Sequence, residues 1–149
     1  MKRKKIAAFL LIILFLCFIG IFIRPRSNFE VGSIFAEALI YNDIDSAKRN
    51  SSPEIWLALE SWPEKHQPIP RNCTSPSDSD VGTWSISGGV AEDEITRSYV
   101  IGRECPDKFY TVAIDDITLR KIDNRWKVTS LGNYCESTIN STEVCFDFE

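Results

Sequence analysis

The sequence predicts an α+β fold, with an N-terminal transmembrane helix followed by about three helices packed on a curved antiparallel sheet of about four strands. Three observations predict it. Residues 6–23 are an unbroken apolar stretch without a charge. Apolar residues then recur at helical spacing between residues 29 and 62. From residue 84 onward their period becomes two, which is typical of strands with one buried face.

Length and charge bound the functions that the chain can have. Of 149 residues, 123 follow Arg26, enough for one compact domain. All 21 Asp and Glu follow Arg26, whereas six of the 17 Lys and Arg lie at or before it, so the domain carries 11 cations against 21 acids, a net charge of −10. This sign excludes nucleic acid as a partner, disfavours anionic lipid headgroups and favours a basic partner or simple solubility.

The N-terminus resembles a membrane anchor. A basic tail, residues 1–5, precedes the apolar stretch 6–23, whose 18 residues would span about 27 Å as a helix, close to the hydrocarbon core of a bilayer. A secretory signal peptide is the alternative, but no A-x-A pattern precedes a plausible cleavage point. We therefore expect an uncleaved span in contact with membrane lipid, followed by a short linker over residues 24–28.

Charge and cysteine usage place the domain outside the cytoplasm. Four basic residues precede the span and two follow it, which predicts a single-pass protein of the cell membrane with a cytoplasmic N-terminus. Four cysteines lie outside the span, an even number that predicts two disulfides: Cys73, Cys105, Cys135 and Cys145. Three pairings are possible. Bonding Cys135 to Cys145 would fasten the tail, residues 135–149, and leave Cys73 for Cys105. No C-x-x-C pair supports zinc instead.

Three asparagines occur in N-x-S/T triplets: Asn50, Asn72 and Asn140. These triplets are acceptors for N-glycosylation if the host is a eukaryote, and they have no such meaning in most bacteria.

Start and stop signals delimit the helices. The first is predicted from Phe29, the second is capped by Asp45, and the third begins with Ser52 as cap and ends before Pro63. Four side chains are expected in the core: Leu39, Trp56, Ile114 and Trp126.

Turn residues delimit the strands, which are predicted around Trp84 and Ile86 and over residues 95–101, 109–122 and 125–131. In the longest strand, the apolar parity changes between Ile114 and Ile117. An extra residue at Asp115-Asp116 would restore one continuous apolar face, so the sequence predicts a β-bulge that bends the sheet there.

The order of elements resembles the nuclear-transport-factor-like superfamily, also called SnoaL-like, with a cystatin-like cone. The resemblance covers about residues 29–134 and depends on the helix pair 36–47 and on the last hairpin, residues 117–128. Asn42 stands where the family pattern usually has glycine. The resemblance implies a cone-shaped domain with a pocket at the concave face of the sheet. It does not imply an activity, because the superfamily holds both enzymes and non-catalytic modules.

The candidate chemistry is sparse. If the protein is an enzyme, the general base is expected to be Asp115 or Asp116, although a bulge alone explains both residues. The only histidine, His66, lies in a proline-flanked loop and is expected to be exposed. Residues 78–89 lack the third acid and the final glutamate of a calcium loop, and residues 87–89 lack the lysine of a phosphate loop. No metal or cofactor is predicted.

Two functions remain open. The first is a non-catalytic, membrane-anchored binding or assembly module with a protein partner in the cell envelope. The alternative is a small extracytoplasmic enzyme or ligand-binding protein that uses the cone pocket. The absence of a convincing acid–base pair in the sequence favours the first.

Overall fold

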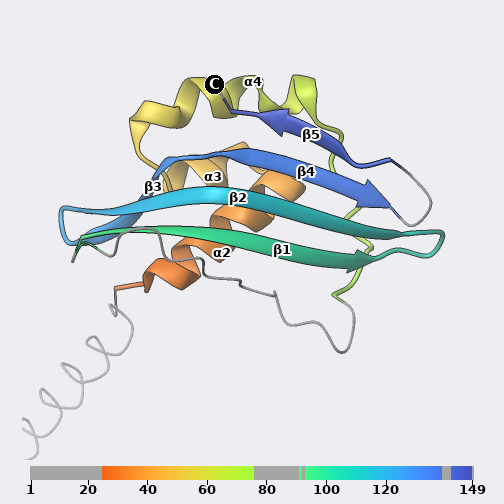
Figure 1. The fold of residues 1–149 in the computed structure, drawn as a ribbon, viewed down its shortest axis with the longest axis horizontal. Coiled ribbons are helices and arrows are strands. Elements are labelled where there is room, and N and C mark those ends of the chain that lie inside the picture. Colours follow the sequence, from red (N-terminus) through yellow and green to blue (C-terminus); the bar gives the residue numbers. More distant parts are fainter. Residues whose placement is uncertain (1–24, 76–90, 92, 139–141, 149) are drawn as a thin grey trace, which may run out of the picture.

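The computed structural model describes residues 25–75, 91, 93–138 and 142–148, which fold as an α+β domain (Figure 1). Its helices are α2 (Asn28–Ile40), α3 (Ile44–Arg49), the 3₁₀ turn η1 (Pro53–Ile55) and α4 (Trp56–Lys65). Its strands are β1 (Glu94–Glu104), β2 (Phe109–Ile122), β3 (Arg125–Ser130), β4 (Asn133–Thr138) and β5 (Val144–Asp147). The predicted combination of about three helices with an antiparallel sheet is confirmed, and the described residues form five strands where about four were predicted.

The described part of the chain contains no helix that is long and apolar enough to span a membrane. The predicted span, residues 6–23, lies outside the described residues, as does the strand predicted around Trp84 and Ile86.

The helices begin with caps that local sequence supplies. Ser27 and Glu30 form a capping box at α2, in which each side chain bonds the other residue's backbone N–H, at 3.2 and 2.7 Å. At α3 the cap is Asp43, which accepts from the N–H of Ser46, and not Asp45, which lies in the first turn. Both carboxylates favour a helix start, but only Asp43 has the non-helical backbone of a cap.

The third helix differs from the prediction at both ends. Ser52 precedes η1, and its hydroxyl bonds the Glu54 carboxylate instead of capping the helix. At the other end, α4 runs through Pro63 to Lys65, because the N–H of His66 donates to the carbonyl of Trp62 at 3.0 Å and closes a further turn. One proline removes one helical hydrogen bond, and here that loss does not end the helix.

The sheet is built around β2. Strand β1 pairs along one edge of β2, and the other edge is shared by β4, which pairs with residues 110–114, and β3, which pairs with residues 118–122. Strand β5 pairs outside β4, giving the order β1-β2-β4-β5 (Figure 1). Helix α2 crosses behind the sheet, and α4 lies beyond β4 and β5.

The predicted bulge in β2 is confirmed. Arg97 pairs with Ile117 and Tyr99 with Ile114, so β2 has one residue more than β1 at Asp115-Asp116. Ile114 and Ile117 are consequently both buried. Gly132 lies against this bulge, because a Cβ there would come within 2.9 Å of the Asp115 carbonyl oxygen and of the Asp116 Cβ. The bulge therefore requires glycine at the junction of β3 and β4.

Two of the four predicted core residues are fully buried, namely Leu39 and Ile114. Trp126 packs half-buried against the core. The prediction for Trp56 is wrong: its side chain is 39% exposed and lies under the Lys48 ammonium, 5.7 Å from the ring centroid. Because η1 takes up the first turn, the buried stripe of α4 passes instead through Leu59 and Trp62.

Both predicted disulfides are present, and they join Cys73 to Cys105 and Cys135 to Cys145. The second links β4 to β5 at a directly paired position. The segment predicted as a tethered tail, residues 135–149, supplies most of β4 and all of β5. The boundary placed after residue 134 therefore falls inside a strand.

Removing the disulfides by paired Cys→Ser changes is expected to lower the free energy of unfolding by unequal amounts. Cys73–Cys105 closes a loop with a sequence separation of 32, and Cys135–Cys145 one of 10. Loop-closure entropy then predicts losses of about 4 and about 3 kcal/mol. Urea unfolding of both double variants measures the difference. Alkylation of any of the four cysteines in the native, unreduced protein would contradict the pairing.

A buried phenol lies where α2 meets β1. Tyr99 is fully buried, and its hydroxyl has no hydrogen-bond partner among the described residues. Its ring covers Gly32, where a Cβ would lie 1.9 Å from the Tyr99 oxygen. Only glycine at position 32 therefore allows the helix this close to the strand.

Tyr99→Phe is expected to raise the free energy of unfolding by about 1 kcal/mol, because it removes an unpaired buried hydroxyl. Burial raises the pKa of Tyr99 to about 12 from 10. Since folding favours the neutral phenol, this contribution to stability is intact below pH 10, and up to about 3 kcal/mol of it is lost between pH 10 and 12. Urea unfolding at pH 8 and pH 11 should therefore show a smaller alkaline loss in Tyr99→Phe. An equal loss in both proteins would contradict this assignment.

Candidate functional site

His66 lies at the centre of a polar cluster, where it was predicted to be an exposed loop residue. It follows the last turn of α4, and its side chain is 1% exposed. The prediction is wrong because strand β4, about 70 residues further on, supplies both a cover and a carboxylate for the ring. We use the name His66 cluster for His66, Asn42, Tyr134 and Glu136.

Asn42 fixes the orientation of the imidazole. Its amide nitrogen donates to the His66 carbonyl at 2.9 Å, so its amide oxygen is the group that lies 3.1 Å from Nδ1 and accepts from it. Asn42 has a left-handed backbone with φ of 51°, which asparagine tolerates better than most residues. Asn42 therefore supplies a side chain that holds the histidine.

The second ring nitrogen has two oxygen neighbours. Nε2 lies 2.9 Å from Glu136 Oε2 and 2.9 Å from the Tyr134 hydroxyl. With a proton on Nε2, the ring donates to the carboxylate as a charge-assisted hydrogen bond. The Tyr134 hydroxyl also lies 3.3 Å from the same carboxylate oxygen and donates to it. Both nitrogens of His66 are thus occupied by groups of the protein.

Tyr134 is held in its protonated form. Burial, and then the neighbouring Glu136 carboxylate, raise the pKa of this phenol far above its ordinary value. The hydroxyl is therefore a hydrogen-bond donor across the physiological pH range and not a base.

Aromatic rings surround the cluster. Trp62 stacks on the His66 ring with centroids 4.7 Å apart and an interplanar angle of 13°. Tyr134 and Phe146 meet His66 edge-on, at 5.0 and 6.3 Å. On its far side, the Trp62 indole N–H donates to the Leu39 carbonyl at 3.0 Å. This packing fixes the position of the imidazole from all three elements, α2, α4 and the β4–β5 pair.

A surface hollow of about 280 Å³ opens beside the cluster. Both members of the pair line it: the Glu136 side chain is 20% exposed, and the His66 side chain is 1% exposed. The rest of the lining is mostly polar: Lys65, Gln67, Ser137, Thr138, Thr142, Val144 and Phe146. The hollow can therefore present a carboxylate to a small polar group or to a side chain of a partner.

Asp115 and Asp116 are placed apart from this cluster. Both side chains are exposed at the bulge of β2, and Asp116 has a left-handed backbone with φ of 54°. The Asp115 carbonyl accepts from the N–H of Gly132 at 3.2 Å. The structure therefore shows a role for these two residues in the geometry of the sheet. It does not bring them into contact with the His66 cluster.

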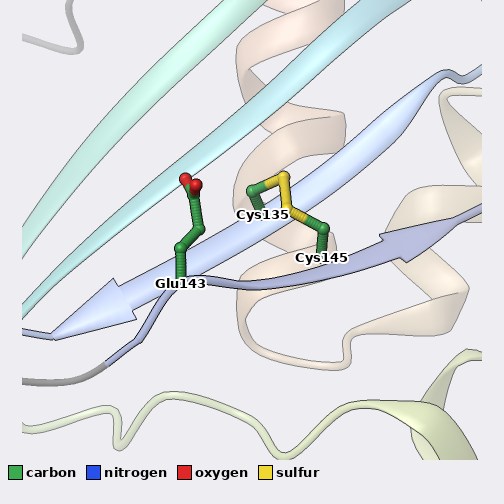
Figure 2. A group of neighbouring side chains, drawn as sticks. All are labelled: Cys135, Glu143 and Cys145. Carbon is green, nitrogen blue, oxygen red and sulfur yellow. A yellow bond between two sulfur atoms is a disulfide. The ribbon is translucent and has the colours of Figure 1, made fainter.

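Near the second disulfide, one further carboxylate approaches the sulfur atoms. Figure 2 shows Glu143 beside Cys135 and Cys145, with possible ligand atoms within 4.8 Å of one another. The two sulfurs are bonded to each other, so they do not act as thiolate ligands. A single exposed carboxylate remains, which is too few ligands for a metal site.

The N-x-S/T triplets differ in accessibility. Asn50 is buried and its amide donates to the Ser46 carbonyl at 2.8 Å, so the folded domain does not offer it for modification. Asn72 is exposed, next to the disulfide-bonded Cys73. Asn140 lies outside the described residues.

Comparison with known proteins leaves these features as the basis for any functional assignment. No family model, no curated protein and no solved structure matches this chain.

Proposed function

We propose that the protein is a single-pass, membrane-anchored extracytoplasmic module that works by binding a protein partner in the cell envelope, without catalysis. Residues 6–23 are the proposed anchor, with residues 1–5 in the cytoplasm. The basic start of the sequence supports this orientation. Two disulfides in a small domain support an oxidising compartment.

One observation carries the non-catalytic part of the proposal. The histidine–carboxylate pair has both ring nitrogens bonded within the protein, and the ring is nearly sealed from solvent. A general base must reach a substrate proton, directly or through one water molecule. A fully bonded, buried imidazole stacked on Trp62 is better suited to stabilising the junction of α4 with β4.

The order of the elements supports the proposed relation to the nuclear-transport-factor-like superfamily. Three helices precede an antiparallel sheet whose longest strand is bulged, as the resemblance implies for a curved sheet. The relation adds no activity, because the fold hosts both enzymes and binding modules.

The partner-binding proposal is tested by photo-crosslinking the full chain in the membranes of intact producing cells. Leu57 is the best position for the photoreactive residue, because it is 79% exposed on the first turn of α4 beside the exposed Trp56. We expect a discrete crosslinked protein, and removal of the domain by protease added outside. Protection from that protease, or a mature N-terminus beyond Ile23, would contradict the topology. Absence of crosslinks from Leu57 and also from Val144, on β5, would contradict the binding role.

A second function is favoured by one specific observation. Glu136 is partly exposed on a hollow and is backed by His66 and by the protonated Tyr134, which could make it the base of a small enzyme or the anchor of a ligand site. Glu136→Gln keeps the shape of the side chain and one acceptor oxygen, and it removes the negative charge. If this variant folds and retains its crosslinks but loses the phenotype of the wild type, the carboxylate does chemistry. A retained phenotype supports the binding role.

A further inference from the structure

A second hollow, of about 520 Å³, lies at the end of the domain where the described chain begins. Three segments that are distant in sequence form it: the entry to α2, the end of α3 and the β2–β3 hairpin. Its lining is Pro25, Arg26, Val31, Arg49, Asn50, Asp123, Asn124, Arg125, Trp126 and Lys127. It shares no residue with the hollow beside Glu136, and we call it the basic hollow.

The basic hollow concentrates positive charge on a domain that is acidic overall. Its lining has four cations, Arg26, Arg49, Arg125 and Lys127, against one acid, Asp123, a net charge of +3. None of the four ion pairs found among the described residues involves any of these cations. The acidic net charge of the sequence therefore conceals a local surface of the opposite sign.

Where hydrogen bonds are shown for these cations, the acceptors are neutral. Arg26 donates to the Asn50 amide oxygen at 3.3 Å, and the Lys127 ammonium donates to the Arg49 carbonyl. Burial, and then the charge of Arg125, lower the pKa of Lys127. A set of like charges gathered in one hollow with neutral acceptors is complementary to an anion.

The backbone of the hairpin holds these cations in place. Asp123 and Asn124 both have positive φ, 49° and 62°, as a type I′ turn requires, so the predicted turn at this pair is confirmed. Strand β3 is then fixed from its outer side, since Ser52 N donates to the Val128 carbonyl and Val128 N to the Asn50 carbonyl, at 2.8 and 3.0 Å. Arg125 and Lys127 therefore project from a fixed strand, and Arg49 projects from the end of α3.

The position of the basic hollow relates it to the membrane. Arg26 is three residues beyond Ile23, the end of the predicted span, so the two lie at most about 11 Å apart along the chain. The β2–β3 hairpin and the first turn of α2 lie at the same end of the domain (Figure 1). Two exposed apolar side chains belong to these segments, Phe29 and Ile122, each 40% exposed. Cations interspersed with apolar side chains are typical of surfaces that rest on a lipid headgroup layer.

We propose that the basic hollow binds the phosphate of an anionic phospholipid headgroup in the leaflet next to the domain. This inference rests on the anchoring part of the proposed function. The guanidinium groups of Arg26, Arg49 and Arg125 supply donors for phosphate oxygens, and Arg can bond them in pairs. Bound in this way, a headgroup orients the domain on the bilayer and leaves α4 and β5 available to a partner.

The test is native mass spectrometry of the full chain released from micelles, titrated with phosphatidylglycerol, with phosphatidylcholine and with inorganic phosphate. We expect phosphatidylglycerol to bind at least tenfold more tightly than phosphatidylcholine. The double variant Arg49→Gln, Arg125→Gln should weaken phosphatidylglycerol binding about 30-fold, from about 1 kcal/mol for each cation near a lipid surface.

The matched control is Arg120→Gln with Lys121→Gln, which removes two positive charges from the hairpin that carries Arg125 but outside the lining of the basic hollow. Retained lipid binding in the control, with unchanged thermal unfolding in both double variants, supports the site. If both double variants weaken phosphatidylglycerol binding equally, the effect comes from overall charge, and the proposed site is contradicted. Equal binding of the two lipids would overturn it as well.

The soluble source of phosphate is distinguished in the same titration. Binding of inorganic phosphate with no advantage for phosphatidylglycerol would overturn the assignment to a lipid. If the protein does not bind phosphatidylglycerol but the protease and crosslinking experiments give their expected results, only the lipid-binding inference is contradicted. A chain that is cleaved and released from the membrane contradicts the anchoring part of the proposed function.

Discussion

Trp62→Ala is expected to lower the free energy of unfolding by about 3 to 5 kcal/mol, the largest loss from any single change on α4. Its ring is fully buried, stacks on His66 and Phe148, and meets Tyr134 edge-on. The change also leaves the Leu39 carbonyl without its indole donor. A single tryptophan therefore joins α2 and α4 to the last two strands.

The matched control is Trp56→Ala, six residues earlier on the same helix. That ring is partly exposed and covered on one side by Lys48, so its removal should cost less than about 1 kcal/mol. Urea unfolding of the two variants, followed by circular dichroism, gives the comparison. Similar losses at the two positions would show that the packing of α4 is not as described.

Local sequence was sufficient to predict the features that depend on backbone chemistry. The change of parity between Ile114 and Ile117 predicted the bulge, because an extra residue is the only way to keep both side chains on the buried face. The Asp123-Asn124 pair predicted the hairpin turn, because both residues tolerate positive φ. The α+β order followed from the change in apolar period.

The candidate site could not be predicted in the same way. His66 meets Asn42 across 24 positions and Glu136 across 70, and no local period relates them. A signal for part of it was nevertheless present: Val144, Phe146 and Phe148 alternate with polar residues, which is the pattern of a strand. If this strand had been predicted to pair with the segment around Cys135, Glu136 would have been predicted to lie in the sheet near the helices.

Net charge describes the whole domain and does not show where its charges lie. The domain's acidic balance predicted repulsion from anionic lipid, but charge acts locally, within about a Debye length of 8 to 10 Å. The four cations of the basic hollow come from three separate segments, and only the fold brings them together. Composition alone could not show that these four side chains line the same hollow.

His66→Ala is expected to cost about 2 to 4 kcal/mol in the free energy of unfolding. The change leaves a cavity against Trp62 and removes the ring nitrogen that lies 2.9 Å from the partly exposed Glu136 carboxylate. Truncating a large buried side chain to alanine typically costs about 2 to 5 kcal/mol, and the partial exposure of Glu136 places the expected loss in the lower part of this range. The phenol of Tyr134 keeps a bond to the carboxylate, which limits the loss further.

Asn42→Gly is the matched variant that isolates the hydrogen bonds from the packing. Its backbone has φ of 51°, which glycine adopts without strain, so the change removes the two side-chain bonds to His66 and leaves the ring in place. We expect a loss of about 1 to 2 kcal/mol, smaller than for His66→Ala. Urea unfolding measures both values, and the indole N–H resonance of Trp62 reports the stacking. If His66→Ala lowers the free energy of unfolding by less than Asn42→Gly does, the imidazole does not hold α4 against β4. That result would favour the catalytic alternative, in which His66 supports Glu136.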